Sequence, residues 1–471
     1  MKDARDDAAP PEHALAAYAV ALAPGDLGEA AERHVADIVL DCLGVAVGAA
    51  AAGHEAGRIA EAHALAISGE GAATLWSGAG RLPADRAALC NGTWAEVLDY
   101  QDVIVHPRNN GHAAVTIVPA AMAVAEREGA DGRALVAAVA AGLEVTLAIL
   151  KAVGRRHRSD GRGFRTSSIA APVGGAVACG KLLGLGEAQM LNAMGLAGAC
   201  APNGLMPSLS PSGGAWGMDK DWVNGLAAQL AVNAADLARL GMTASDRVVT
   251  GDRGIAASHA HGDAAPLVAP EGGMPNWGAV ALKKFAACYG VHSAMEAAMR
   301  LRAETGWSAE EIDRVTVRIK ADSAVTLAGR KIGNHMAARF SLPYAVASAV
   351  VRGEASSIRD FEPPAISDPE VLGYMDRVAV EADPELTRFH DETGGFPAIV
   401  TLHRGTETAE TRIDYPVGSA ERPMSREEQR AKFRELTEGY WDDARRDRIL
   451  ATGEDLLSLG DVGEWTRFLR D

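Results

Sequence analysis

Residues 134–153 read ALVAAVAAGLEVTLAILKAV, an apolar run that predicts a buried helix. The run is rich in small residues and is interrupted by Glu144 and Lys151, so we expect a packed core helix rather than a membrane span. A second apolar run, residues 38–52, is interrupted by Asp41 in the same way. Both runs favour a helical domain with a large core.

From His13 to about Leu240, apolar residues recur with helical spacing, and Gly or Pro residues lie between the predicted helices. The predicted helices of this half cover residues 14–22, 29–51, 57–67, 83–97, 113–128, 132–152, 168–183, 187–198 and 222–240. After about Ala279 two further helices are predicted, at residues 293–305 and 342–351. They alternate with runs in which every second residue is apolar, as in strands: 315–319, 377–383, 397–404 and 411–418.

A chain of 471 residues exceeds what one hydrophobic core usually serves. We therefore predict a mainly α protein with a large all-helical domain over residues 1–268 and a smaller α+β domain over residues 269–424. A capping box of Ser425 and Glu428 begins a last predicted helix. Residues 425–471 are expected to pack back on the helical domain.

The formal net charge is −16, from 46 basic and 62 acidic residues, and no long basic block is present. Nucleic acid and anionic membrane surfaces are therefore poor partners, whereas a small acidic metabolite remains possible in a local cationic pocket. The N-terminus has no apolar signal core. No CxxC pair occurs, and we expect buried free thiols in a reduced, cytoplasmic protein, at Cys42, Cys90, Cys179, Cys200 and Cys288.

Residues 98–114 read LDYQDVIVHPRNNGHAA and concentrate polar groups between apolar helices. Two carboxylates, Asp99 and Asp102, and two imidazoles, His106 and His112, fall within this span. Such polar density is costly inside a fold unless a site uses it, so this stretch is the first candidate for catalysis.

Common cofactor and metal motifs are missing from the sequence. It contains no Walker loop, no GxGxxG after a strand, no HExxH and no GxSxG. His259 and His261 suggest a metal at first sight, but no Cys or carboxylate cluster accompanies them in the sequence. We predict no metal and no cofactor.

Several motifs occur in an order that resembles the MmgE/PrpD family over nearly the whole chain. They are NGTWAEVLDYQD (91–102), HAAVTIVPAAMAVAE (112–126), GRGF (161–164), GKLLGLGEAQMLNAMGLAG (180–198), DKDWVNGLAA (219–228), KKFAACYGVHSAMEAA (283–298) and ARFSLPYAVASAV (338–350). The resemblance implies a cofactor-free enzyme with an active site in the cleft between a helical and an α+β domain, usually as a homodimer. It also implies proton transfer next to the carboxylates of a small polyanion.

The resemblance assigns residues to this chemistry. Asp99 and Asp102 match the family's two acidic positions; either would orient a histidine or bind a substrate hydroxyl, or else cap a helix or form a salt bridge. His112 matches the family histidine and is the first choice for acid or base. His106 lies in a segment that looks added between two family motifs. It is either the functional imidazole or a loop residue.

The cations come from later motifs. Lys220 matches a family lysine and would bind a carboxylate or act as an acid. One of Lys283 and Lys284 would reach the cleft, the other being solvated. Where the family usually has a histidine after GRGF, this chain has Arg165, which cannot act as a base near neutral pH but binds carboxylates well. Position 165 is therefore expected to bind substrate.

Three further candidates are Tyr344, His292 and Arg339. Tyr344 matches the tyrosine of the family's FSxxY-like pattern and would donate its phenol to substrate, with a core tyrosine as the alternative. His292 and Arg339 lie beside these motifs and would contact substrate, with Arg339 adding to anion binding.

Three functions remain open from the sequence. The first is a cofactor-independent lyase that dehydrates or decarboxylates a small polycarboxylate. The second is an epimerase or isomerase of a related acid, with two bases facing opposite sides of one carbon. The third is a catalytically silent protein that binds a small anion.

Overall fold

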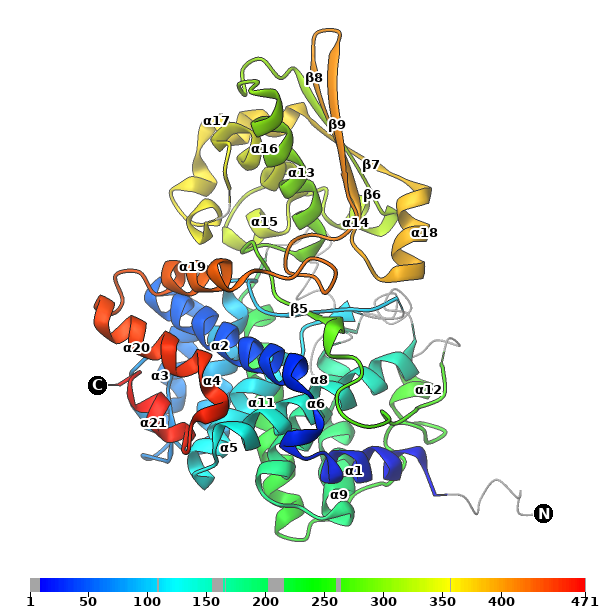
Figure 1. Cartoon of the computed structure of the whole chain (residues 1–471), viewed down its shortest axis with the longest axis vertical. Coiled ribbons are helices and arrows are strands. Elements are labelled where there is room, and N and C mark those ends of the chain that lie inside the picture. The colour runs from blue at the N-terminus through cyan, green and yellow to red at the C-terminus, as the bar shows by residue number, and fades with distance from the viewer. Residues whose placement is uncertain are drawn as a thin grey trace, which may run out of the picture.

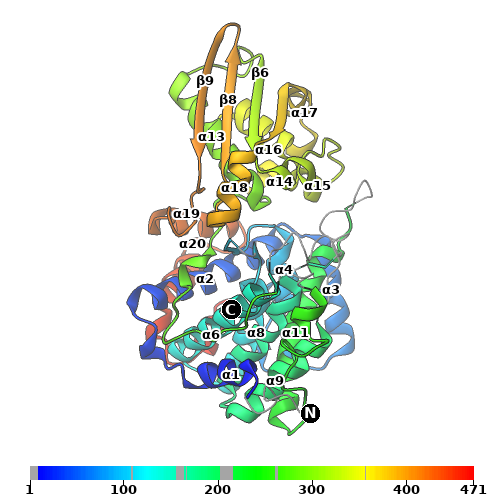
Figure 2. The same cartoon turned by 90° about the vertical axis from the view of Figure 1, so that its right-hand side faces the viewer.

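The computed structural model describes residues 9–107, 110–154, 164–165, 167–201, 216–259, 264–355 and 357–470. It confirms a mainly helical protein with a large helical region and a smaller region built on a mixed sheet (Figure 1). Figure 2 shows the two regions at opposite ends of the long axis, with α19 (Arg426–Leu436) near their junction.

The helical region carries most of the core. Its described helices are α1 (Pro11–Ala21), α2 (Glu29–Ala51), α3 (Glu55–Ile67), α4 (Ala84–Val97), α5 (Ala114–Glu128), α6 (Gly132–Val153), α8 (Ser167–Leu182), α9 (Glu187–Cys200), α11 (Asp219–Arg239) and α12 (Ile255–His259). The apolar run at residues 134–153 forms most of α6. This helix begins where the Asp131 side chain accepts a hydrogen bond from the Ala134 N–H.

Helices α2 and α6 are long and apolar enough to cross a membrane by length and composition. In the folded chain, 72% of the apolar window of α2 and 94% of that of α6 are buried. This burial is what core helices of a folded protein show. The structure therefore supports the prediction that the two runs are packed core helices.

Helices α4 and α11 approach closely through facing glycines. A Cβ at Gly225 would lie 2.3 Å from both the Leu89 carbonyl oxygen and the Thr93 hydroxyl. A Cβ at Gly92 would lie 3.0 Å from the Gly225 Cα. These glycines let the two backbones touch, and both helices carry side chains of the candidate site.

We expect Gly225→Ala to destabilise the protein by about 1–3 kcal/mol or more, because the added methyl overlaps backbone that cannot move freely. Chemical denaturation followed by circular dichroism measures this loss. The control is Gly186→Ala, since a Cβ at Gly186 meets nothing within 4 Å. Equal stabilities of the two variants would contradict the close approach of α4 and α11.

The helical region is not wholly helical, which corrects the predicted all-helical domain. Short strands β1 (Ala73–Thr74) and β2 (Arg81–Leu82) pair with each other. Strand β3 (Val103–Val105) lies between β4 (Asn110–Gly111) and β5 (Val280–Ala281). Periodicity did not reveal these strands because each has only two or three residues. The β3 and β5 pairing brings the segment after β5 beside the polar stretch at 98–102.

The smaller region is built on a four-stranded sheet of order β7-β6-β8-β9. Its strands are β6 (Arg314–Ile319), β7 (Val378–Ala382), β8 (Ala398–Arg404) and β9 (Glu407–Ile413). Only β6 and β7 are parallel. The first three predicted strands are confirmed. The fourth was placed too late at 411–418, because β9 begins directly after a tight turn at Gly405 and ends before Pro416.

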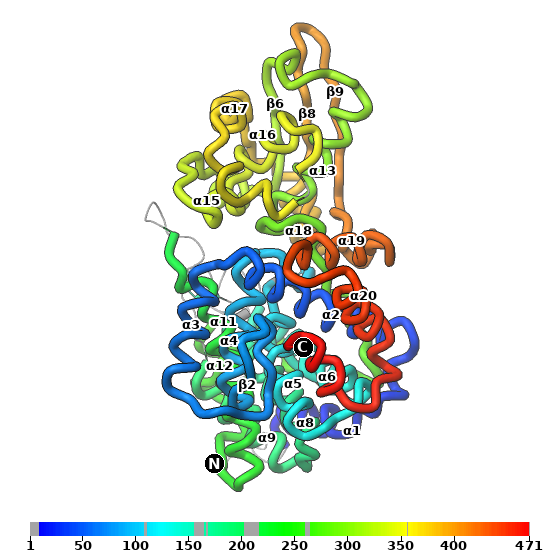
Figure 3. The backbone as a smooth tube through the Cα atoms, turned by 90° about the vertical axis from the view of Figure 1, so that its left-hand side faces the viewer, coloured from blue at the N-terminus to red at the C-terminus, as the bar shows by residue number. Residues whose placement is uncertain are grey.

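Helices surround this sheet, and the C-terminus returns to the helical region. The helices are α13 (Tyr289–Thr305), α14 (Ala321–Thr326), α15 (His335–Arg339), α16 (Leu342–Arg352), α17 (Pro369–Tyr374) and α18 (Pro384–Thr393). Figure 3 shows α19, α20 (Asp443–Glu454) and α21 (Val462–Arg467) lying along the helical region. Lys432 Nζ of α19 lies 2.7 Å from Asp41 Oδ1 of α2. This buried ion pair joins the C-terminal segment to the helical core.

The cysteines are all unpaired, as predicted, but not all are buried. Cys42, Cys90 and Cys179 lie in the core, and Cys288 is partly exposed. Cys200 is exposed, which corrects its predicted burial, because it is the last residue of α9.

Candidate active site

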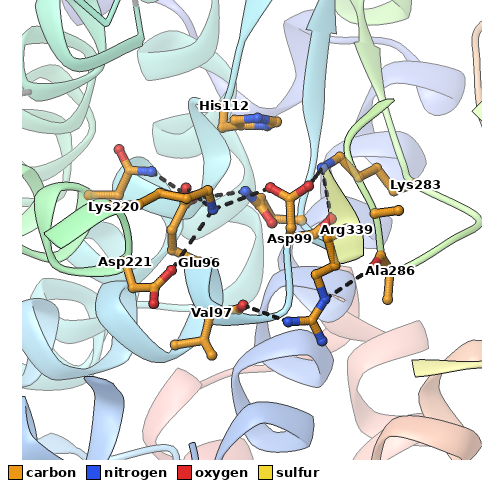
Figure 4. Close-up of polar contacts among 12 residues, drawn as sticks. Glu96, Val97, Asp99, His112, Lys220, Asp221, Lys283, Ala286 and Arg339 are labelled. Atoms are coloured by element: carbon orange, nitrogen blue, oxygen red, sulfur yellow. Dashed lines mark hydrogen bonds and ion pairs between the residues drawn. The ribbon is translucent and has the colours of Figure 1, made fainter. Parts of the chain in front are cut away.

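A buried group of charges forms where α4 ends and α11 begins. Glu96 lies in the last turn of α4, and Lys220 lies in the first turn of α11. Lys220 Nζ is 2.8 Å from Glu96 Oε1 and 3.2 Å from Asp99 Oδ1. None of these three side chains is more than 1% exposed (Figure 4). The contact between α4 and α11 thus positions a buried lysine between two carboxylates.

Asp99 connects this group to the segment that follows β5. It adopts a left-handed backbone conformation with φ of 49°, which Asp tolerates better than most residues. Lys283 Nζ donates to the Asp99 carbonyl oxygen at 2.7 Å and lies 3.1 Å from Asp99 Oδ2. One carboxylate therefore pairs with two buried lysines that are remote in sequence.

His112 lies beside this group at the start of α5 (Figure 4). Its Nδ1 donates to the Asp102 carbonyl oxygen at 2.5 Å, since a carbonyl can only accept. The neutral ring then carries its free electron pair on Nε2, for which no described residue supplies a hydrogen bond. This tautomer leaves Nε2 able to take a proton.

Asp102 acts as a helix cap, one of the alternatives weighed for it. Its carboxylate accepts hydrogen bonds from the backbone N–H groups of Ala113 and Ala114, both at 3.1 Å, and of Val115 at 3.2 Å. The same residue that caps α5 therefore holds His112 through its carbonyl. Burial raises the pKa of the Asp102 carboxyl to about 6, although these N–H groups favour the ionised form.

For the paired groups, neighbouring opposite charges shift the pKa values more strongly than burial does. Burial raises the pKa of Glu96, but Lys220 and Arg165 hold it below its ordinary value. Burial likewise opposes ionisation of Asp99, but Lys283 and Lys220 hold its pKa well below the usual range. Burial lowers the pKa of Lys220, and Glu96 and Asp99 reverse that effect and raise it. These groups are therefore charged at neutral pH.

For His112, burial has a larger effect on the pKa than the neighbouring carboxylates do. Burial, and then the positive charge of Lys283, lower its pKa to about 4. The imidazole is therefore neutral at neutral pH, although Glu96 and Asp99 partly offset the shift. A neutral imidazole beside ammonium groups is an arrangement in which one group accepts a proton and others stabilise negative charge.

Two predicted anion-binding arginines are buried with partners of their own. Arg165 lies 3.3 Å from Glu96 Oε1 and donates to the Lys220 carbonyl oxygen at 3.2 Å. Arg339 donates to the carbonyl oxygens of Ala286 at 3.1 Å and Val97 at 3.4 Å. Arg165 thus belongs to the charge group, whereas Arg339 ties the end of α4 to the smaller region.

Lys284 and Tyr344 have partners outside the charge group within the part of the chain that the structure describes. Lys284 is partly exposed and pairs with Glu428 at 3.4 Å. The Tyr344 hydroxyl donates to the carbonyl oxygens of Asp360 at 2.6 Å and Ala365 at 3.2 Å, inside the smaller region. His106 follows β3 and lies against Gly394 at the end of α18.

His292 is fully buried near the group without bonding to it. Its Nε2 donates to the Ala287 carbonyl oxygen at 3.1 Å, and its ring packs on Phe285 and Tyr289. Burial and the charge of Lys283 lower its pKa to about 3. The imidazole of His292 is therefore neutral at neutral pH.

The carboxylate at the centre of the group, that of Glu96, was not among the site residues predicted from the sequence. Glu96 accepts from Asn224 Nδ2 at 2.7 Å and Gln101 Nε2 at 2.8 Å, in addition to its cations. Its position inside an apolar helix was the available signal. Asp221 was also missed; burial raises the pKa of its carboxyl to about 7, although Lys220, 3.9 Å away, opposes the shift.

Some predicted elements fall outside the described residues. These are residues 108–109 of the segment after His106, residues 161–163 of the GRGF motif, and His261. His259 is buried in α12, and its Nδ1 donates to the Ile255 carbonyl oxygen at 2.9 Å.

The fold and the charge group define a two-region protein in which a neutral histidine meets paired lysines and carboxylates at the end of a helix. The chain belongs to the MmgE/PrpD family. The MmgE/PrpD N-terminal domain matches residues 13–267, and the MmgE/PrpD C-terminal domain matches residues 285–456. The family includes lyases, among them cis-aconitate decarboxylase.

Two relatives are distantly similar to this chain in sequence. Cis-aconitate decarboxylase from Homo sapiens is 28% identical over 414 residues, which covers 84% of this chain and 81% of the relative. Cis-aconitate decarboxylase from Mus musculus is 25% identical over 447 residues, which covers 92% of this chain and 88% of the relative.

Proposed function

We propose that this protein is a cofactor-independent lyase that acts on a small polycarboxylate by moving a proton at a carbon next to a carboxylate. The observation that carries the proposal is the neutral His112, whose Nε2 has no hydrogen-bond partner among the described residues, beside the buried group of Lys220, Lys283 and Asp99. Membership of a family of polycarboxylate lyases supports the substrate class.

The chemistry follows from where charge must develop. Removing a proton from carbon next to a carboxylate, or losing CO2 from it, places negative charge on that carbon and its neighbouring oxygens. Buried ammonium groups stabilise this charge more strongly than water does, because the surroundings have a low dielectric constant. We assign that role to Lys220 and Lys283.

His112 is assigned the proton transfer. In a dehydration, its Nε2 takes the proton from carbon, and an ammonium group donates a proton to the departing hydroxyl. In a decarboxylation, the bond to CO2 breaks and its electron pair stays on carbon, and carbon then takes a proton from His112 Nε2, which must first have been protonated by water. Asp102 orients the ring in both cases by accepting from Nδ1.

Substrate carboxylates must compete with groups already in place. Lys220 and Lys283 are fully buried and paired with Asp99, and Arg165 is paired with Glu96. We therefore propose that the regions separate to admit substrate and that its carboxylates take over part of these contacts. A cleft between the regions, a homodimer and a cytoplasmic location stay predictions of this proposal.

Incubation of the purified protein with cis-aconitate and with citrate-type hydroxy acids in D2O, followed by proton NMR, tests the function. We expect one acid to lose CO2 or water, with deuterium entering at carbon in a decarboxylation. Deuterium exchange without net loss of substrate would instead support the epimerase or isomerase. If no acid in the panel reacts or exchanges while one binds tightly, the protein is a small-anion binder and the lyase proposal is wrong.

A further inference from the structure

A second cluster of ionisable side chains lies apart from the proposed catalytic group. His54, His335 and Glu362 place one potential ligand atom each within 4.8 Å of one another. His54 comes from the turn between α2 and α3, whereas His335 begins α15 and Glu362 follows a short turn at residues 358–361. The cluster therefore joins the helical region to the smaller region.

One imidazole of the cluster is already paired, and the other has an unused nitrogen inside the protein. His54 Nε2 lies 3.1 Å from Glu362 Oε1, and the rings of His54 and His335 stand edge to face with centroids 4.8 Å apart. His335 Nε2 is buried and has no hydrogen-bond partner among the described residues. Buried polar nitrogens are normally bonded, so this nitrogen, beside the pair of His54 with the Glu362 carboxylate, points to a missing ligand.

Arg339 bonds to one oxygen of the Glu362 carboxylate and leaves the other oxygen available to an ion. Its guanidinium donates to Glu362 Oε1, and no described residue donates to Oε2. A carboxylate that binds an ion through one oxygen and a hydrogen-bond donor through the other is a common arrangement around metals. Glu362 also lines a surface hollow of about 830 Å³ with Arg359 and Pro363.

We propose that His54, His335 and Glu362 bind one divalent transition-metal ion of the zinc class that fastens the two regions together. Two imidazoles and one carboxylate form a donor set that such ions accept, with a remaining position for water. Ligand atoms lie roughly 2 Å from zinc, so the three atoms must close by about 1 Å, which side-chain rotation supplies. The site is separate from the proposed catalytic chemistry.

The experiment uses the full chain after treatment with a chelator. Titration with Zn²⁺ by calorimetry should give one site per chain, and Zn²⁺ should raise the thermal unfolding temperature. Co²⁺ should give a ligand-field absorption that Zn²⁺ abolishes. His335→Asn and Glu362→Gln should each weaken binding at least about 10-fold, as loss of a ligand or of its support does. The matched control is His63→Ala, an exposed histidine on α3, which should bind as the wild type does.

His335→Asn is the cleaner variant, because Glu362→Gln also disturbs Arg339. If either variant fails to fold, the Co²⁺ absorption of the wild-type chain still decides the matter, since it reports the ligands directly. Absence of a Co²⁺ band and of any Zn²⁺ effect on unfolding would overturn the proposal. Zn²⁺ binding that His335→Asn leaves unchanged would also overturn it.

Discussion

Replacing His112 by asparagine is expected to lower kcat by about 10²–10⁴-fold with the acid that the wild-type protein turns over, because the proposed proton-transfer group is lost. The amide keeps a polar group near the Asp102 carbonyl, so the fold should survive. Initial rates and circular dichroism of both proteins measure the two effects. The control is His403→Asn, a partly exposed histidine on β8, which should leave kcat unchanged.

The same residue sets the expected pH dependence. The pKa of His112 is lowered to about 4, so the base is lost only when the pH falls through that value. For the dehydration, in which His112 is the base, we expect kcat/KM to hold from neutral pH down to about 5 and then to fall, rather than to decline near the ordinary histidine value. For the decarboxylation, in which protonated His112 is the acid, we expect kcat/KM to rise as the pH falls toward 4. A decline centred near 6 would point instead to Asp102, whose pKa is about 6. Ellipticity recorded at each pH separates this loss from unfolding.

Replacing Lys283 by methionine should give the second large effect. The Lys283 ammonium is fully buried and bonds to both the carbonyl and the carboxylate of Asp99. Removing Lys283 takes the donor from the Asp99 carbonyl oxygen and the cation from Oδ2, while Lys220 still pairs with Oδ1. We therefore expect a cost of about 3 kcal/mol, at the lower end of the range of about 3–5 kcal/mol for a broken buried pair. We expect this loss in chemical denaturation, together with a large fall in kcat from the missing cation.

The adjacent residue supplies a matched control. Lys284 is partly exposed and lies 3.4 Å from Glu428, so Lys284→Met should cost no more than about 1 kcal/mol. Its kcat should stay close to that of the wild type. If Lys284→Met lowers kcat as much as Lys283→Met does, the inferred difference between the two lysines is wrong.

Arg165 stands where the family usually has a histidine, and it forms part of the buried charge group. Arg165 cannot take a proton near neutral pH, and its guanidinium lies against Glu96 and the Lys220 carbonyl oxygen. It therefore supports the carboxylate that holds Lys220. Its predicted role in substrate binding remains a prediction, and it requires the Arg165 guanidinium to exchange part of its contact with Glu96 for a substrate carboxylate.

Much of the fold was predictable because its signals are local. Helical spacing of apolar residues located α2, α5 and α6, and alternation located β6 and β8. The strands that position the site were not predictable in this way. Strand β3 pairs with β5 across about 175 residues, and two-residue strands carry no periodic signal.

The sequence by itself determined the helical character, the two-region organisation and the concentration of Asp99, Asp102 and His112 in one short polar stretch. The tertiary structure alone decided that Lys283 rather than Lys284 meets Asp99, and that Glu96 joins Lys220, 124 residues away. The physical reason is that periodicity reports which face of one element is buried. Ion pairs between distant segments depend instead on how closely α4 and α11 pack and on where β5 pairs.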